Sequence, residues 1–225
     1  NVSNNALAGV TDSTVTLLDA LTVRAVDDSE LWTLAGSVGV SFKPGGSLAG
    51  GIAVTHGGGA TEAKAENLTL TGSDATDAPK TDLTVEALAR DYIRTMTLGA
   101  AVGGVALSNA TAVNEVKRSV EAALSGLKVR DADGNAWTGA RQLDAVTIGA
   151  ISDAQISNLG IVIGGAGTGA LGVGFSQNKA QVDVSAKGSG LNALLDTLDI
   201  HASSSNDIET IAVGATGAGN AALGG

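Results

Sequence analysis

The sequence has no cysteine, and only two prolines, two tryptophans, two phenylalanines and one tyrosine occur among its 225 residues. Without cysteine the chain can form no disulfide, thiolate nucleophile or zinc–thiolate site. Because large aromatic side chains are so few, small side chains must fill the interior, and the 32 glycines allow backbones to approach one another closely. This composition favours thin, stacked sheets.

Basic residues are scarce as well. The 13 lysines and arginines stand against 23 acidic residues, for a net charge of -10, and no basic run is present to bind phosphates. We therefore expect no nucleic-acid partner. No run of about 18 apolar residues is present either, which argues against a membrane span and places any export signal outside this chain. With 44% hydrophobic residues the chain should nevertheless fold.

The chain contains an internal repeat. Four segments each open with alternating aliphatic residues and an alanine, followed by a further aliphatic residue: LTVRAVDDSELW from Leu21, LTVEALARDYIR from Leu83, VTIGAISDAQIS from Val146 and LDIHASSSNDIE from Leu198. A Gly/Ala-rich stretch follows each of them. We predict a single repeat-built domain over residues 1–225, with repeats starting near 21, 83, 146 and 198 and partial repeats at both ends.

Apolar and polar residues alternate along several segments, which is the period of a β-strand. The alternation is clear in AQVDVSAK at 180–187 and in residues 32–42. Residues 112–127 alone resemble an amphipathic helix, but the repeat register favours a strand in which Arg118 is the only residue out of pattern. Residues 190–198 are a second candidate helix. The expected fold is all-β, a repeat-built β-solenoid, formed either as a single-chain parallel helix or from stacked hairpins.

A dinucleotide-binding spacing, G-x-G-x-x-G, occurs at residues 167–172 after an apolar run. Such a loop binds a pyrophosphate when it leaves a strand and opens a helix. Here the residues after Gly172 alternate as a strand, and the aligned stretches of the other repeats carry glycines at different spacings. We therefore predict no cofactor and no helix at Gly172, and we expect Gly167, Gly169 and Gly172 to contact neighbouring backbone.

Asp131, Asp133 and Asn135 are spaced like the first ligands of a calcium loop. The twelfth position of such a loop would be Gln142 instead of glutamate. A turn capped by these side chains is therefore favoured, and a weak calcium site is the alternative. A second acidic cluster, at residues 27–30, is interpreted as a solvated loop.

No catalytic residue is predicted. His56 and His201 lie in different repeats, and neither has a local cluster of metal donors. Enzymes that cleave polysaccharides on a β-helix need carboxylates with Lys or Arg on one sheet face. The nearest approach to that set is at residues 90–91 and 117–118, and we interpret these as surface charges.

The two ends of the chain complement each other. Residues 1–15 resemble the polar half of a repeat, and the chain stops at AALGG, where an alternating strand would begin. A repeat protein cut in mid-repeat exposes two sheet edges that can accept further strands. We expect either a slice of a larger protein or subunits that join head to tail.

Three stretches, VRAVDDSELWTLAGSVGVS at 23–41, ATAVNEVKRSVEAAL at 110–124 and the opening NVSNN, resemble the repeats of leukotoxin-type filamentous adhesins, which are large bacterial surface and secreted proteins. The resemblance implies an extended β-rich stalk or filament outside the cell, without catalytic residues. The expected partners are adjoining repeats or copies of the chain, and a host or cell-surface glycan or protein. The alternative is a β-helix glycan-processing enzyme or a carbohydrate-binding module.

Overall fold

The protein is built from strands. The computed structural model describes residues 1–16, 20–42, 45–71, 81–131, 133–136 and 143–225, and no helix occurs among them. The strands are β1 (Val2–Thr11), β2 (Thr14–Thr16), β3 (Ala20–Val40), β4 (Gly46–Glu66), β5 (Thr69–Thr71), β6 (Asp82–Ser125), β7 (Lys128–Arg130), β8 (Leu143–Ser189), β9 (Leu195–Ala218) and β10 (Ala221–Gly224).

The prediction of an all-β protein is confirmed. β6 runs through residues 112–125 as a strand, as the repeat register favours over the helix. The candidate helix at 190–198 is wrong, because β9 begins within it at Leu195. Consistent with this content, the described residues include no helix that could cross a bilayer.

All pairings between the named strands are parallel, which excludes stacked hairpins for these strands. The pairing of β3 with β6, β6 with β8 and β8 with β9 places Leu21, Leu83, Val146 and Leu198 side by side. These are the residues at which the four aligned segments begin. A slip by one residue would turn every side chain to the opposite face, so this register keeps equivalent positions buried in successive strands.

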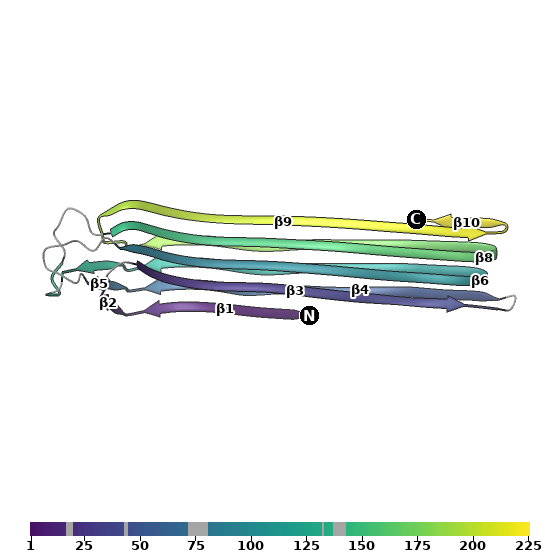
Figure 1. Ribbon diagram of the computed structural model, residues 1–225, viewed down its shortest axis with the longest axis horizontal. Helices are drawn as coiled ribbons and strands as arrows, with labels where there is room; N and C mark the ends of the chain where they lie inside the picture. The colour runs from purple at the N-terminus through teal and green to yellow at the C-terminus, as the bar shows by residue number, and fades with distance from the viewer. Residues whose placement is uncertain (17–19, 43–44, 72–80, 132, 137–142) are drawn as a thin grey trace.

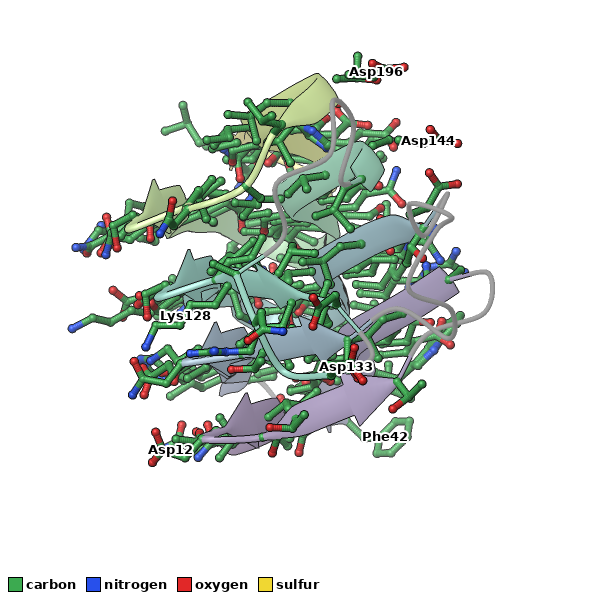
Figure 2. All side chains as sticks on the ribbon, turned by 90° about the vertical axis from the view of Figure 1, so that its left-hand side faces the viewer. Asp12, Phe42, Lys128, Asp133, Asp144 and Asp196 are labelled. Atoms are coloured by element: carbon green, nitrogen blue, oxygen red, sulfur yellow. The ribbon has the colours of Figure 1, made fainter. Side chains whose placement is uncertain are left out.

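β6 and β8 each fold back on themselves, which creates two facing layers. β6 pairs with β3 in its first half and with β4 in its second half, and its register with β8 shifts between Gly103 and Val105. The first layer comprises β3, β9 and the first halves of β6 and β8; the second layer comprises β1, β4, β10 and the second halves. Viewed along the strands, the two layers are neighbouring columns (Figure 2).

The two ends of this sandwich differ. At the reversal end the first layer ends and the second begins, after residues 41–42 and before residues 45–46 in the first passage, and near residues 103–105 and 166–169 in the next two. At the loop end the short strands β2, β5 and β7 stack as a separate parallel sheet. Figure 1 shows the loop end on the left and the reversal end on the right, joined by long, nearly straight strands.

The interior becomes thinner from the loop end to the reversal end. Large aliphatic residues, including Leu83, Leu124 and Leu143, fill the loop end, whereas an alanine cluster that contains Ala101 and Ala106 fills the reversal end. Near that cluster a Cβ added to Gly99 would lie 2.0 Å from the carbonyl oxygen of Asn109. The two backbones therefore approach as closely as the glycine-rich composition indicates.

The G-x-G-x-x-G hexamer lies at the reversal end within β8, so no helix begins at Gly172, as predicted. The expected backbone contacts are present: the Gly225 N–H donates to the Gly172 carbonyl at 3.1 Å, and Gly169 lies in register with Val105 and Ala221 of the neighbouring strands. A Cβ at Gly167 or Gly169 would meet nothing within 4 Å, and one at Gly172 would meet the side chains of Val162 and Thr216 at 2.6 and 3.0 Å. The open space at Gly167 and Gly169 therefore lies only where a side chain would point, and the carbonyl oxygen of Gly167 would lie 2.6 Å from a Cβ added to Gly219.

Candidate functional site

A cluster of charges is buried between the two layers. Arg118, from the second half of β6, donates from Nε and Nη2 to the two carboxylate oxygens of Asp91, at 2.9 and 2.5 Å. Its Nη1 donates to Asp27 Oδ2 at 2.5 Å. The side chain of Arg118 is 0% exposed, and those of Asp91 and Asp27 are 1% and 7% exposed. One guanidinium therefore holds carboxylates from two neighbouring strands of the facing layer.

Polar neighbours complete this cluster. Ser29 donates to Asp27 Oδ1 at 3.0 Å and accepts from Asn4 Nδ2 at 3.0 Å. Arg118 also donates to the backbone carbonyl of Asn4 at 3.3 Å. Burial alone would lower the pKa of Arg118, but the hydrogen bonds and charges of Asp91 and Asp27 outweigh burial and raise it above its ordinary value. The guanidinium is therefore permanently charged.

Glycine is needed beside this cluster. Asn4, Gly59 and Arg118 lie in register in the second layer. Gly59 has φ of 139°, and a Cβ there would lie 1.7 Å from the carbonyl oxygen of Asn4, the same oxygen that accepts from Arg118. Only glycine adopts this conformation without strain, and it allows β1 to approach the guanidinium.

Two interpretations from sequence are corrected here. Asp91 and Arg118 are not surface charges, although their neighbours Arg90 and Lys117 do face outward. The acidic cluster at 27–30 is not a loop, because it lies within β3 and alternates between buried and exposed positions. The sequence held a signal for this cluster, because Arg118 was the one residue that broke the alternation. Its side chain occupies an inward position where the second half of β6 otherwise has uncharged residues.

Hydrogen-bonded side chains continue the polar interior toward the reversal end. Thr95 donates to Asn114 Oδ1 at 2.6 Å, Asn114 donates to Asn178 Oδ1 at 2.8 Å, and Asn178 donates to Thr210 Oγ1 at 2.7 Å. This chain of hydrogen bonds crosses from one layer to the other twice and joins three strands that are neighbours in the sheet, β6, β8 and β9. It therefore ties the register of the two layers together.

The outer surface of the first layer carries a shallow groove. The guanidinium of Arg94 lies over the ring of Trp32, 4.8 Å from its centre, and Trp32 Nε1 donates to Glu30 Oε1 at 2.8 Å. Gln155 and Glu209 line the same groove. An exposed aromatic ring among amide and carboxylate groups is a surface that can stack on a ring and hydrogen-bond to hydroxyl groups.

The predicted calcium candidates lie in a tight turn. The two carboxylate oxygens of Asp131 accept from Asn135: Oδ1 from the backbone N–H at 2.7 Å, and Oδ2 from the side-chain Nδ2 at 3.3 Å. The backbone N–H of Gly134 donates to the Asp131 carbonyl at 3.1 Å. Asp133 is exposed, and Gln142 lies outside the described residues. In the described part of the chain no three His, Asp or Glu side chains group closely enough to hold a metal ion. Calcium binding stays a prediction.

The two histidines each lie near one carboxylate. His56 Nε2 is 3.5 Å from Glu115, and His201 Nδ1 is 3.3 Å from Asp199. On the same outer surface Lys179 donates to Glu115 at 3.1 Å, and this hydrogen bond holds the pKa of Glu115 below its ordinary value. The pairs at Glu115 connect β6 with β4 and β8, whereas His201 and Asp199 both lie in β9, and none of these pairs forms a catalytic constellation.

No protein-family model matches the chain, and neither the curated proteins nor the solved structures include a significant match.

Proposed function

We propose that this chain is a structural and adhesive segment of an extracellular bacterial surface or filament protein, built as a β-solenoid. The observation that carries the proposal is the parallel register in which each passage through the first and second layers returns beside the previous one. Stacked repeats of this kind bury a continuous core that one repeat cannot bury alone. A longer protein is then built by adding further repeats, which place new strands beside the existing ones.

The sheet edges support assembly. Among the described residues β3 pairs only with β6, and β9 pairs only with β8, so each has one edge without a partner strand. An unpaired edge is a template for another strand. Adjoining repeats of a longer protein, or further copies of the chain, fit these edges. The extracellular location and the bacterial source rest on the resemblance to filamentous adhesins.

The interior column that ends at β9 provides a test of edge pairing. Leu31, Ile93, Ile156 and Ile208 lie in register, and Ile208 is the last member. Ile208→Lys puts a charge where the next row would have to pack, a device that natural edge strands use against association. Glu209→Lys, on the outward face of the same strand, is the matched control.

We expect wild-type protein and Glu209→Lys to lengthen with concentration in sedimentation and electron micrographs, and Ile208→Lys to stay short. The particles should be ribbons about 70 Å wide, the length of a 21-residue strand, with a repeat of about 4.8 Å along their axis. Equal lengthening of all three proteins, or single particles of constant size, would overturn head-to-tail assembly.

The outer groove favours carbohydrate binding as a second candidate function. Its supporting observation is the exposed ring of Trp32 between Glu30 and Arg94. A glycan array with wild type and Trp32→Ala tests it, and Val26→Ala, an outward position of β3 outside the groove, is the control. Binding that only Trp32→Ala abolishes supports a glycan target, and an empty array rejects it.

A further inference from the structure

Among the described residues, the charged side chains are confined to one half of the sandwich; Lys43 lies outside the described residues. Residues 31–42, 95–114, 157–178 and 210–225 contain no Asp, Glu, Lys, Arg or His. The register places these segments side by side at the reversal end, together with residues 45–55. We call this region the charge-free half. Its boundary is sharp, because Arg94 pairs with Trp32 in the first layer and His56 pairs with Glu115 in the second.

Most side chains on both outer surfaces of the charge-free half are apolar, and the polar exceptions on the second layer include Asn109, Thr111 and Gln177. On the first layer the exposed large apolar side chains are those of Leu34, Val38, Val40, Met96, Val102, Ile163, Ile211 and Val213. On the second layer they are those of Leu48, Ile52, Val54, Val105, Leu107, Leu171, Val173, Phe175 and Leu223. The interior between them holds Thr95, Asn114 and small residues. This is the reverse of a sandwich in water, where the apolar side chains face inward, and so large an exposed apolar surface marks an interaction site.

The dimensions of this surface match a lipid bilayer. Ten residues of β3 and its continuation, residues 33–42, span about 33 Å at about 3.3 Å per residue, close to the hydrocarbon thickness of about 30 Å. At the boundary lies Trp32, 69% exposed, with Arg94 over its ring and Tyr92 beside Glu30. Aromatic rings and long basic side chains are the residues that favour the level of the lipid headgroups.

We propose that the charge-free half inserts into the hydrocarbon of a lipid bilayer while the charged half stays in water. A second copy of the chain fits less well, because it would cover one broad face and leave the other face and Phe42, 96% exposed, in water. Fluid acyl chains would cover both outer surfaces and the reversal end, including Phe42, at the same time.

Backbone pairing is needed for insertion, since unpaired N–H and C=O groups are costly in hydrocarbon. The first half of β6 has partner strands on both sides, in β3 and β8. The outer edges of β3 and β9 gain partners only from adjoining rows, so at this point the inference rests on the edge pairing of the proposed function.

Two valines of the same strand test the insertion. Val26 and Val38 both face outward from β3, with 42% and 67% exposure, but Val26 lies in the charged half and Val38 in the charge-free half. The full chain is floated with phosphatidylcholine vesicles. We expect wild type and Val26→Glu to float equally, independently of salt, and Val38→Glu to lose at least about tenfold in partition because a charge on the lipid-facing surface opposes insertion.

Trp32 serves as a depth reporter in the Trp137→Phe variant, which leaves it as the single tryptophan. We expect lipids brominated near the headgroup to quench it more than lipids brominated near the chain ends. No flotation of wild type, or equal loss from both valine variants, would overturn the insertion. So would lipid-free oligomers that Val38→Glu disperses, which would assign the apolar faces to a second copy.

The assembly assay separates this inference from the proposed function. Concentration-dependent lengthening without flotation overturns the insertion alone. Flotation of a protein that does not lengthen in lipid-free solution supports the insertion and overturns head-to-tail assembly in water, and the edges of β3 and β9 would then have to pair within the bilayer.

Discussion

The guanidinium of Arg118 and the carboxylate of Asp91 face each other across the two layers, joined by two hydrogen bonds of 2.9 and 2.5 Å with both side chains buried. Because the carboxylate comes from the first half of β6 and the guanidinium from the second, this ion pair holds the two halves of the same strand against each other across the interior. A further hydrogen bond from Arg118 to Asp27 connects β3 to the same guanidinium. A fixed alignment of the layers, more than net stability, is the expected contribution of such a buried charge network.

Removing the guanidinium should destabilise the fold strongly. Arg118→Met leaves two buried carboxylates without a partner, and we expect a loss of about 3–5 kcal/mol in the free energy of unfolding, measured by urea denaturation. The outward neighbour provides the control, since Lys117→Met should change stability by no more than about 0.5 kcal/mol. Equal effects of the two substitutions would show that the buried network does not hold the layers.

Replacing the whole network should reverse that loss. In Arg118→Met combined with Asp27→Leu and Asp91→Leu no unpaired charge remains, and we expect stability to return to the wild-type level or above. The alignment of the layers should then be less well specified. Broader lines in NMR spectra of the strand residues at wild-type stability would report this loss, and wild-type line widths would contradict it.

Gly59 should tolerate no side chain. Gly59→Ala forces an alanine into φ of 139° and toward the Asn4 carbonyl, and we expect a loss of about 2 kcal/mol or more. Gly169→Ala is the matched comparison, because its Cβ would meet nothing within 4 Å. That substitution should be neutral within about 0.5 kcal/mol. Urea unfolding of the two variants measures both, and a neutral Gly59→Ala would refute the requirement.

Calcium should leave the stability unchanged if Asp131 only caps its turn. The carboxylate of Asp131 is already occupied by the N–H and side-chain amide of Asn135. We expect thermal unfolding curves recorded with calcium and with a chelator to superimpose. A calcium-dependent rise in Tm that Asp131→Asn abolishes would instead establish the weak calcium site.

Acid should weaken the outer pair between Lys179 and Glu115. The pKa of Glu115 is lowered in the folded protein by its hydrogen bond from Lys179. Its contribution is therefore present above the ordinary pKa of the carboxyl and is lost as the pH falls through the lowered value. We expect the small destabilisation caused by Lys179→Met at neutral pH to shrink progressively as the pH falls below the ordinary range of a glutamate carboxyl. A difference that persists in acid would assign the effect to packing of the lysine stem.

Much of the strand arrangement was predictable, because parallel pairing stacks equivalent positions and a repeat therefore shows its register in its own alignment. The alignment of Leu21 with Leu83 and of Val146 with Leu198 is such a case. The alternation also marked Arg118 as the one residue out of pattern, but the sequence interpretation placed its charge on the surface, and only the structure shows that it is buried. Its partners were not predictable, because Asp91 and Asp27 lie in different strands of the opposite layer, and alternation says nothing about what faces a residue across the interior.

The sequence by itself determined the all-β content, the inward and outward faces of each strand, and the segments without charge. Only the tertiary structure decided that β6 and β8 fold back on themselves near Gly103 and residues 166–169. That reversal brings the charge-free segments to one end and places Arg118 opposite Asp91. The physical reason is that alternation and propensity act between neighbours along a strand, whereas the pairing of faces depends on where a long chain turns.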